Sequence, residues 1–245
     1  MRNIWTIAKR EYNAYYNSPL AYVVMTVLFL WIGVIFAFDL IAVTNSAFFT
    51  QALQPERYLG SLIVIILLSS PVLTMRLISE ESRTGTLELL LTAPLRDWEL
   101  VTGKWLGAFG FMVTTLGLTL IFPVMINGMT NPGIDLKLTA STYLGMFLAV
   151  SAFLGIGVGI SALFTNQFAA FFTTFGVLIV MWVLIGVPAN FLPVGSELLT
   201  YLDMSSHFTG FTLGDVKLAD IIYYVSVTAL GLFVGNIAVD YRRWK

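Results

Sequence analysis

The chain has 245 residues, of which 58% are hydrophobic and 11% are charged, and its formal net charge is −1. Soluble domains carry about 25% charged residues, so this composition excludes an ordinary soluble fold and favours a protein that is dissolved in a bilayer. The absence of cysteine excludes disulfides and thiolate metal sites, and the near-zero net charge predicts no nucleic-acid partner.

The first segment, residues 1–19, predicts an amphipathic elbow helix that lies in the membrane interface. At about 100° per residue its aromatic side chains gather in one arc, with polar and basic side chains beside and opposite it. A Ser-Pro dipeptide ends the segment, because the residue before proline avoids helical geometry. A simple topological anchor and a contact for a cytoplasmic partner are both consistent with this pattern. The residues that we expect to define the elbow are Trp5, Lys9, Arg10 and Tyr12.

Six mainly apolar stretches follow, each near the roughly 20 residues that a spanning helix needs. Asp39 and Asp240 close the first and the last of them, and polar residues at 165–167 divide a long charge-free run into two. The alternative is that one stretch, the one containing Pro71, is a buried core helix rather than a span. The six predicted spans are 20–38, 58–75, 106–126, 143–164, 168–187 and 221–239.

Basic residues between these spans predict the orientation, because cytoplasmic loops carry an excess of Lys and Arg. With the N-terminus inside, ten basic residues lie inside and three lie outside, and an even number of spans places the C-terminus inside as well. The inside group is Arg2, Lys9, Arg10, Arg76, Arg83, Arg96, Lys104, Arg242, Arg243 and Lys245, and the outside group is Arg57, Lys137 and Lys217.

The most polar segment, residues 76–100, predicts a cytoplasmic loop built from short helices. Glu80 can pair with Arg76 or Arg83 at helical spacing, so the second span is expected to continue as a helix beyond Arg76. Gly85 permits a turn, and Asp97 is expected to cap the helix that enters the third span.

After that turn a short amphipathic helix is expected from Thr86 to about Leu91, with leucines on one face. Docking to a partner and resting on the lipid surface are both consistent with this helix. The candidate contact residues of the whole loop are Glu80, Glu81, Arg83, Gly85, Thr86, Leu87, Glu88, Leu90 and Leu91.

Residues 188–217 predict a re-entrant or interfacial segment on the outer side, which must be covered by protein or line a cavity. His207 is the only histidine in the chain, and we expect it to be a packed or hydrogen-bonding residue rather than a metal ligand. Glycine pairs at G-x-x-x-G spacing predict close helix packing, within the chain or between subunits. They are Gly103/Gly107, Gly155/Gly159 and Gly231/Gly235.

Several motifs are missing. No predicted span has a charged residue near its middle, which disfavours a proton- or sodium-coupled carrier. The chain has no P-loop, so it does not bind ATP in the Walker manner, and it has no protease, esterase or paired-carboxylate signature. We therefore expect a non-enzymatic membrane subunit whose energy comes from another protein.

The run EESRTGTLELLLTAP from Glu80 to Pro94, followed by Asp97-Trp-Glu-Leu and Gly103-Lys104, resembles the cytoplasmic loop of ABC-2 type transporter permeases. Within that superfamily the chain is similar to the gliding-motility-associated group. The motifs that carry this second likeness are Lys9-Arg-Glu-Tyr12, Asn17-Ser-Pro19, Ala21-Tyr22, His207-Phe208, Gly214-Asp215, Asp220 to Tyr224 and Arg242-Arg243-Trp244.

The resemblance implies an all-α, ABC-2 (type V exporter-like) permease fold that spans residues 1–245 in one domain of a prokaryotic cell membrane. It also implies a separate ATPase subunit pair, which binds the ATP and Mg that this chain does not bind itself. A coupling helix at 86–91 is expected to dock on that pair. The second membrane subunit is either another copy or a larger protein with an outer domain. Two other functions stay open: mechanical transmission to an outer partner without transport, and an ATP-independent carrier or scramblase.

Overall fold

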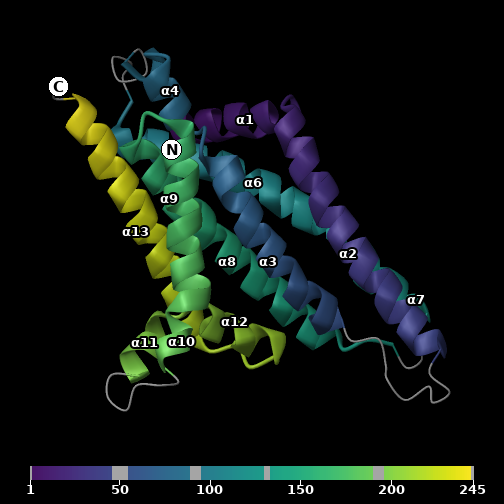
Figure 1. Ribbon diagram of the computed structural model, residues 1–245. Helices are drawn as coiled ribbons and strands as arrows, with labels where there is room; N and C mark the ends of the chain where they lie inside the picture. Colours follow the sequence, from purple (N-terminus) through teal and green to yellow (C-terminus); the bar gives the residue numbers. More distant parts are fainter. Residues whose placement is uncertain (1, 46–54, 89–94, 130–132, 190–195, 244–245) are drawn as a thin grey trace.

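The computed structural model describes residues 2–45, 55–88, 95–129, 133–189 and 196–243, and this part of the chain is a bundle of helices with no strand (Figure 1). Six of its helices are long and apolar enough to cross a membrane, which confirms the six predicted spans. The elements are α1 (Arg2–Tyr16), α2 (Pro19–Asn45), α3 (Pro55–Thr74), α4 (Ser79–Arg83), α6 (Asp97–Thr119), α7 (Ile121–Met129), α8 (Leu136–Leu163), α9 (Gln167–Ile179), the π-helical turn η1 (Val180–Leu184), α10 (Gly186–Ala189), α11 (Ser196–Leu202), α12 (Met204–Thr212) and α13 (Leu218–Arg243).

The long helices run between two ends of the molecule (Figure 1). One end, called here the α4 end, carries α1, α4 and the last turns of α13, so both chain termini lie there. The opposite end, called the α12 end, carries the short helices α10, α11 and α12. α1 lies across the direction of the long helices, as an elbow helix in an interface would.

Polar caps begin several helices, and some predicted boundaries change. Asn166 accepts the amide of Phe168 at 2.9 Å and begins α9, which separates the fourth and fifth spans as predicted. Asp97 is the first residue of α6 rather than its cap, because Arg96 takes the cap position and its amide donates to Glu99 Oε2 at 3.1 Å. α2 and α13 continue past the acidic residues expected to close them, since a charge ends the apolar stretch but not the helical hydrogen bonding.

Glycines bring α8 and α13 into close contact in the middle of the bundle. A Cβ added at Gly159 would lie 2.3 Å from the carbonyl oxygen of Gly231, and one added at Gly231 would lie 2.5 Å from that of Gly155. A Cβ added at Gly235 would likewise lie 3.3 Å from the Cα of Gly159. These G-x-x-x-G motifs therefore pack two spans of the same chain against each other, and the structure uses them within the subunit.

A second close contact joins the elbow helix α1 to α6. A Cβ at Gly107 would lie 2.5 Å from the Cβ of Glu11, and Gly103 similarly faces Ile7. The aromatic arc expected to face lipid is therefore divided, because α1 buries Tyr15 in the protein whereas Trp5 is 71% exposed. The buried face of α1 packs on protein, so this helix is fixed to the third span.

Candidate functional site

A sharp turn follows α3 at the α4 end, and α8 holds it in place. Pro71 has no amide to donate within α3, and Thr74 Oγ1 donates to the carbonyl of Ser70 at 2.9 Å, so the last turn of α3 is already irregular. Ser161 Oγ at the end of α8 accepts the amides of Ile78 and Ser79, both at 3.2 Å. The helix that was expected to continue past Arg76 is interrupted there: residues 75–78 form a turn, and helix resumes as α4 at Ser79.

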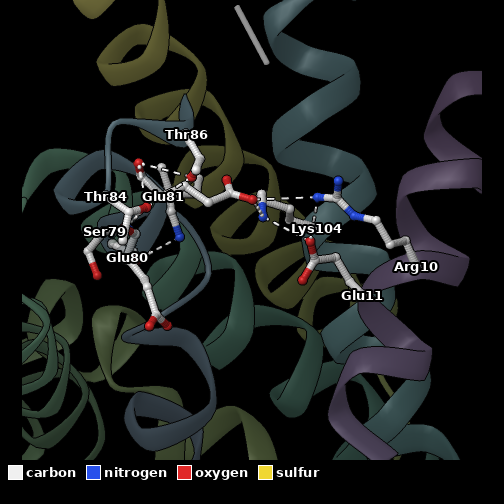
Figure 2. A network of polar contacts seen from close by, with 10 residues as sticks. Arg10, Glu11, Ser79, Glu80, Glu81, Thr84, Thr86 and Lys104 are labelled. Atoms are coloured by element: carbon white, nitrogen blue, oxygen red, sulfur yellow. Dashed lines mark hydrogen bonds and ion pairs between the residues drawn. The ribbon is translucent and has the colours of Figure 1, made fainter. Parts of the chain in front are cut away.

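Lys104 connects three elements at this turn (Figure 2). Its ammonium donates to Glu81 Oε1 of α4 at 2.8 Å and to Glu11 Oε1 of α1 at 2.9 Å, and its side chain is 2% exposed. Removing an ammonium group from water is costly unless it is paired, and here two carboxylates compensate it. We call Arg10, Glu11, Glu81 and Lys104 the Lys104 clamp.

Arg10 completes the clamp from α1. It lies 3.1 Å from Glu11 Oε1 and 3.5 Å from Glu81 Oε1, and its side chain is 55% exposed, so solvent screens both contacts. Burial alone would raise the pKa of Glu11, but the charge and hydrogen bond of Lys104, helped by Arg10, outweigh it and the net pKa is lowered. Glu11 is therefore held in its charged form, which is the form that the clamp requires.

The chain then turns back into a polar hairpin, residues 83–88. Gly85 has φ +73°, a left-handed conformation that glycine adopts without strain, so the predicted turn lies where it was expected. Arg83 lies 4.0 Å from Glu80, the predicted pairing at i,i+3. Arg83, Thr86 and Glu88 are exposed at the surface.

Two expectations for this loop change, and two lie outside the described residues. Leu87 is 3% exposed and belongs to the chain's own core, so it is not presented to a partner's groove. Glu81, expected as a candidate contact for a partner, pairs inside the chain with the buried Lys104. The other leucines proposed for docking, Leu90 and Leu91, lie outside the described residues.

Further contacts tie the segment to the bundle. The hydroxyl of Tyr15 on α1 donates to the carbonyl of Leu73 near the end of α3 at 3.0 Å. Arg242, close to the end of α13, donates to Ser82 Oγ on α4. The α4 segment, by which we mean residues 75–88, is thus connected to α1, α6, α8 and α13 by polar contacts, and its outer edge is a charged, exposed hairpin.

The sequence model of one protein family, described as ABC-2 family transporter protein, matches residues 5–239. The match covers all six spans, the elbow helix and the α4 segment. This chain belongs to the ABC-2 family. It is accordingly a multi-pass cell membrane protein, as its six apolar helices require.

This ABC-2 family protein also has similar relatives among curated sequences. It is 29% identical over 143 residues to the probable multidrug ABC transporter permease YbhR of Escherichia coli strain K12, and to the protein of the same name from strain O157:H7. Each match covers 58% of this chain and 38% of the relative, so the aligned part is less than half of the relative's length.

Sequence reasoning about this ABC-2 protein missed the residues that organise the site. The sequence marks Lys104 only as a basic residue of the inner side and Glu11 only as part of a motif, because a lysine beside an apolar span is ordinarily a flanking charge. Ser161 gave no signal, because a serine at the end of a glycine-rich helix has many possible roles. Only the packing of α8 on α3 brings its hydroxyl to the turn.

Proposed function

We propose that this chain is the membrane permease subunit of an ATP-driven transporter that exports its substrate, with ATP hydrolysis in a separate ATPase pair. The α4 end then faces the cytoplasm, in agreement with the excess of basic residues there. The single observation that carries the proposal is the Lys104 clamp, because it connects an exposed polar hairpin to the elbow and to a span.

The contacts of the α4 segment support a path for force from an ATPase into the membrane. A push on hairpin 83–88 reaches α6 and α1 through Glu81 and Lys104, at 2.8 Å and 2.9 Å contacts. The same push reaches α8 through Ser161, which holds the amides before α4. A rigid polar connection transmits displacement better than a solvated loop, since each of these bonds lies in a buried or partly buried place.

A cavity of about 330 Å³ lies between α1 and the α3–α4 turn, and the clamp residues Glu11, Glu81 and Lys104 line one part of it. Tyr15, Leu73 and Arg76 are among the residues that line it. In this proposal ATP and Mg bind to the ATPase subunits and not to this chain.

The proposal is tested by purifying the chain from its native membrane and identifying the proteins that accompany it. An ATPase should co-purify with the wild type and be lost from the double variant Arg83→Glu, Glu88→Lys, which inverts two exposed charges of the hairpin. A second variant, Leu90→Asp with Leu91→Asp, tests the predicted docking face. Lys217→Glu inverts an exposed charge in the turn between α12 and α13 and is the matched control that should keep the ATPase.

The outcome also decides between the other functions. If no ATPase accompanies the wild type, an ATP-independent carrier or scramblase becomes the favoured function. If all variants retain the ATPase equally, the ATPase docks elsewhere and the hairpin is not the docking surface. A larger membrane protein with an outer domain in the same sample would support the gliding-motility-associated group, to which the terminal motifs of the chain are similar. A second copy alone would support a homodimer.

A further inference from the structure

The α12 end contains a compact polar site that the transport scheme does not use. Asp203 caps α12, since its Oδ1 accepts the amide of Ser205 at 3.1 Å, and the chain therefore turns sharply between α11 and α12. This turn places His207 on the inner face of α12, where its side chain is 9% exposed. Asp220, in the first turn of α13, faces it and is 10% exposed.

Both ring nitrogens of His207 face acceptors. Nδ1 lies 2.6 Å from Asp220 Oδ1, and Nε2 lies 2.9 Å from the carbonyl oxygen of Tyr201 in α11. A backbone carbonyl has no hydrogen to donate, so Nε2 must carry one. The contact between Nδ1 and the carboxylate then needs a second hydrogen, because two lone pairs at 2.6 Å would repel each other.

The surroundings favour placing that second hydrogen on the ring. The ring of Tyr223 stacks on His207 with centroids 4.1 Å apart and an interplanar angle of 19°. The face of an aromatic ring attracts a cation, and Tyr201 adds an edge contact at 5.4 Å. The first turn of a helix favours a negative group, so Asp220 at the start of α13 is suited to be the carboxylate.

We propose that His207 and Asp220 form a proton-binding site in which both ring nitrogens of His207 carry hydrogen and Asp220 is the carboxylate partner. The bound proton latches α11 and α12 to α13, because it completes the chain of contacts from Tyr201 through His207 to Asp220. Its loss leaves a buried carboxylate without its cation and removes one of the two hydrogen bonds of the ring. The α12 end then loosens from α13.

Other ionisable groups surround the pair on each element that packs near it, and most of them are acidic or neutral. Asp215 and Lys217 pair with each other at 3.0 Å and are both exposed, so their charges are largely cancelled and screened. The negative charges of the other acidic groups favour retention of the proton. A cavity of about 440 Å³ reaches the pair, so protons can exchange with the solution. The groups are Glu197 and Tyr201 of α11, Asp203 before α12, Asp215 and Lys217 before α13, and Asp220, Tyr223 and Tyr224 of α13.

Two tyrosine hydroxyls of α13 keep the loosening local. Tyr223 donates to the carbonyl of Leu202 at 2.7 Å and Tyr224 to that of Met204 at 2.8 Å, and neither bond depends on the proton. We therefore expect α12 to gain motion around His207 without separation of the whole segment from the bundle.

Nitrogen NMR tests the proton directly, because the chain has a single histidine and ¹⁵N-histidine labelling gives one imidazole spectrum. In bilayer nanodiscs at pH 8 both ring nitrogens should bear hydrogen, because each of them faces an acceptor. In Asp220→Asn the spectrum at pH 8 should be that of a neutral ring. A wild-type spectrum at pH 8 with one bare nitrogen overturns the proposal, and this result does not require the variant to fold.

Amide hydrogen exchange at one fixed pH tests the latch. Exchange of residues 204–212 should be several-fold faster in Asp220→Asn than in the wild type, whereas Asp215→Asn should leave it unchanged. Asp215 is the matched control, because it is also acidic, lies nearby and is exposed. Equal exchange in Asp220→Asn and wild type would show that the pair does not hold α12.

Discussion

At the scale of single residues, Lys104 decides how the elbow helix and the α4 segment are joined. It lies in the first turns of a membrane span with only 2% of its side chain exposed, and the two carboxylates that pair with it come from residues 93 and 23 positions away in sequence. Without the ammonium of Lys104, the carboxylates of Glu11 and Glu81 would repel each other, since like charges in a partly buried place interact strongly.

Replacing Lys104 with methionine should destabilise the protein by about 3 kcal/mol, because it leaves Glu11 and Glu81 without their common cation. The triple variant with Glu11→Gln and Glu81→Gln should recover much of this loss, since a neutral cluster has no unpaired charge. The free energy of unfolding of the purified proteins in detergent measures both the loss in the single variant and the recovery in the triple variant. Equal stability of the single variant and the wild type would show that the clamp has no structural role.

The lowered pKa of Glu11 gives the clamp a dependence on acid. Its contribution to stability is present in full above its ordinary value of 4.5 and is lost as the pH falls through the lower value of the folded protein. The difference in unfolding free energy between wild type and Glu11→Gln should therefore be constant near neutrality and shrink below about pH 4.5. A difference that grows toward acid would contradict the charged state of Glu11.

At the scale of elements, the bundle depends on two glycine contacts, α8 with α13 and α1 with α6. Small residues let helices approach in a bilayer, where the lipid offers no hydrophobic gain for packing apolar side chains together. The first contact closes the centre of the bundle, and the second fixes the elbow to the span that carries Lys104.

Replacing Gly159 with alanine should lower the free energy of unfolding by about 2 kcal/mol. The added Cβ would lie 2.3 Å from a backbone oxygen of α13, so the two helices must move apart. Alanine at Gly176 is the matched control, since a Cβ there meets nothing within 4 Å and alanine favours a helix. Thermal unfolding of both variants should show a loss for the first and no loss for the second. If the Gly176 variant lost more stability than the Gly159 variant, the close approach of α8 and α13 at Gly159 would be contradicted.

At the scale of the whole molecule, both termini and the α4 segment lie at one end, and α10–α12 lie at the other (Figure 1). This arrangement requires the first and last spans to begin and finish on the same side of a membrane, as an even number of spans does. The charge bias of the sequence predicts that this side is the cytoplasm.

Cysteine labelling tests this orientation cleanly, because the chain has no cysteine of its own. Lys9→Cys, exposed on α1, should react with a membrane-impermeant maleimide only in inverted vesicles. Asp215→Cys, exposed between α12 and α13, should react on intact cells or spheroplasts. The opposite pattern would invert the topology and place the α4 segment outside, where no cytoplasmic ATPase could reach it.

The sequence by itself determined the number of spans, the elbow with its break before Pro19, and the turn at Gly85, because each depends on local hydropathy or on backbone preferences of one or two residues. Only the tertiary structure decided the Lys104 clamp, the burial of Leu87 and the pairing of His207 with Asp220. These contacts join helices that are distant in the chain. Their partners are set by how the helices pack, and apolar spans of similar composition do not encode that packing in any local pattern.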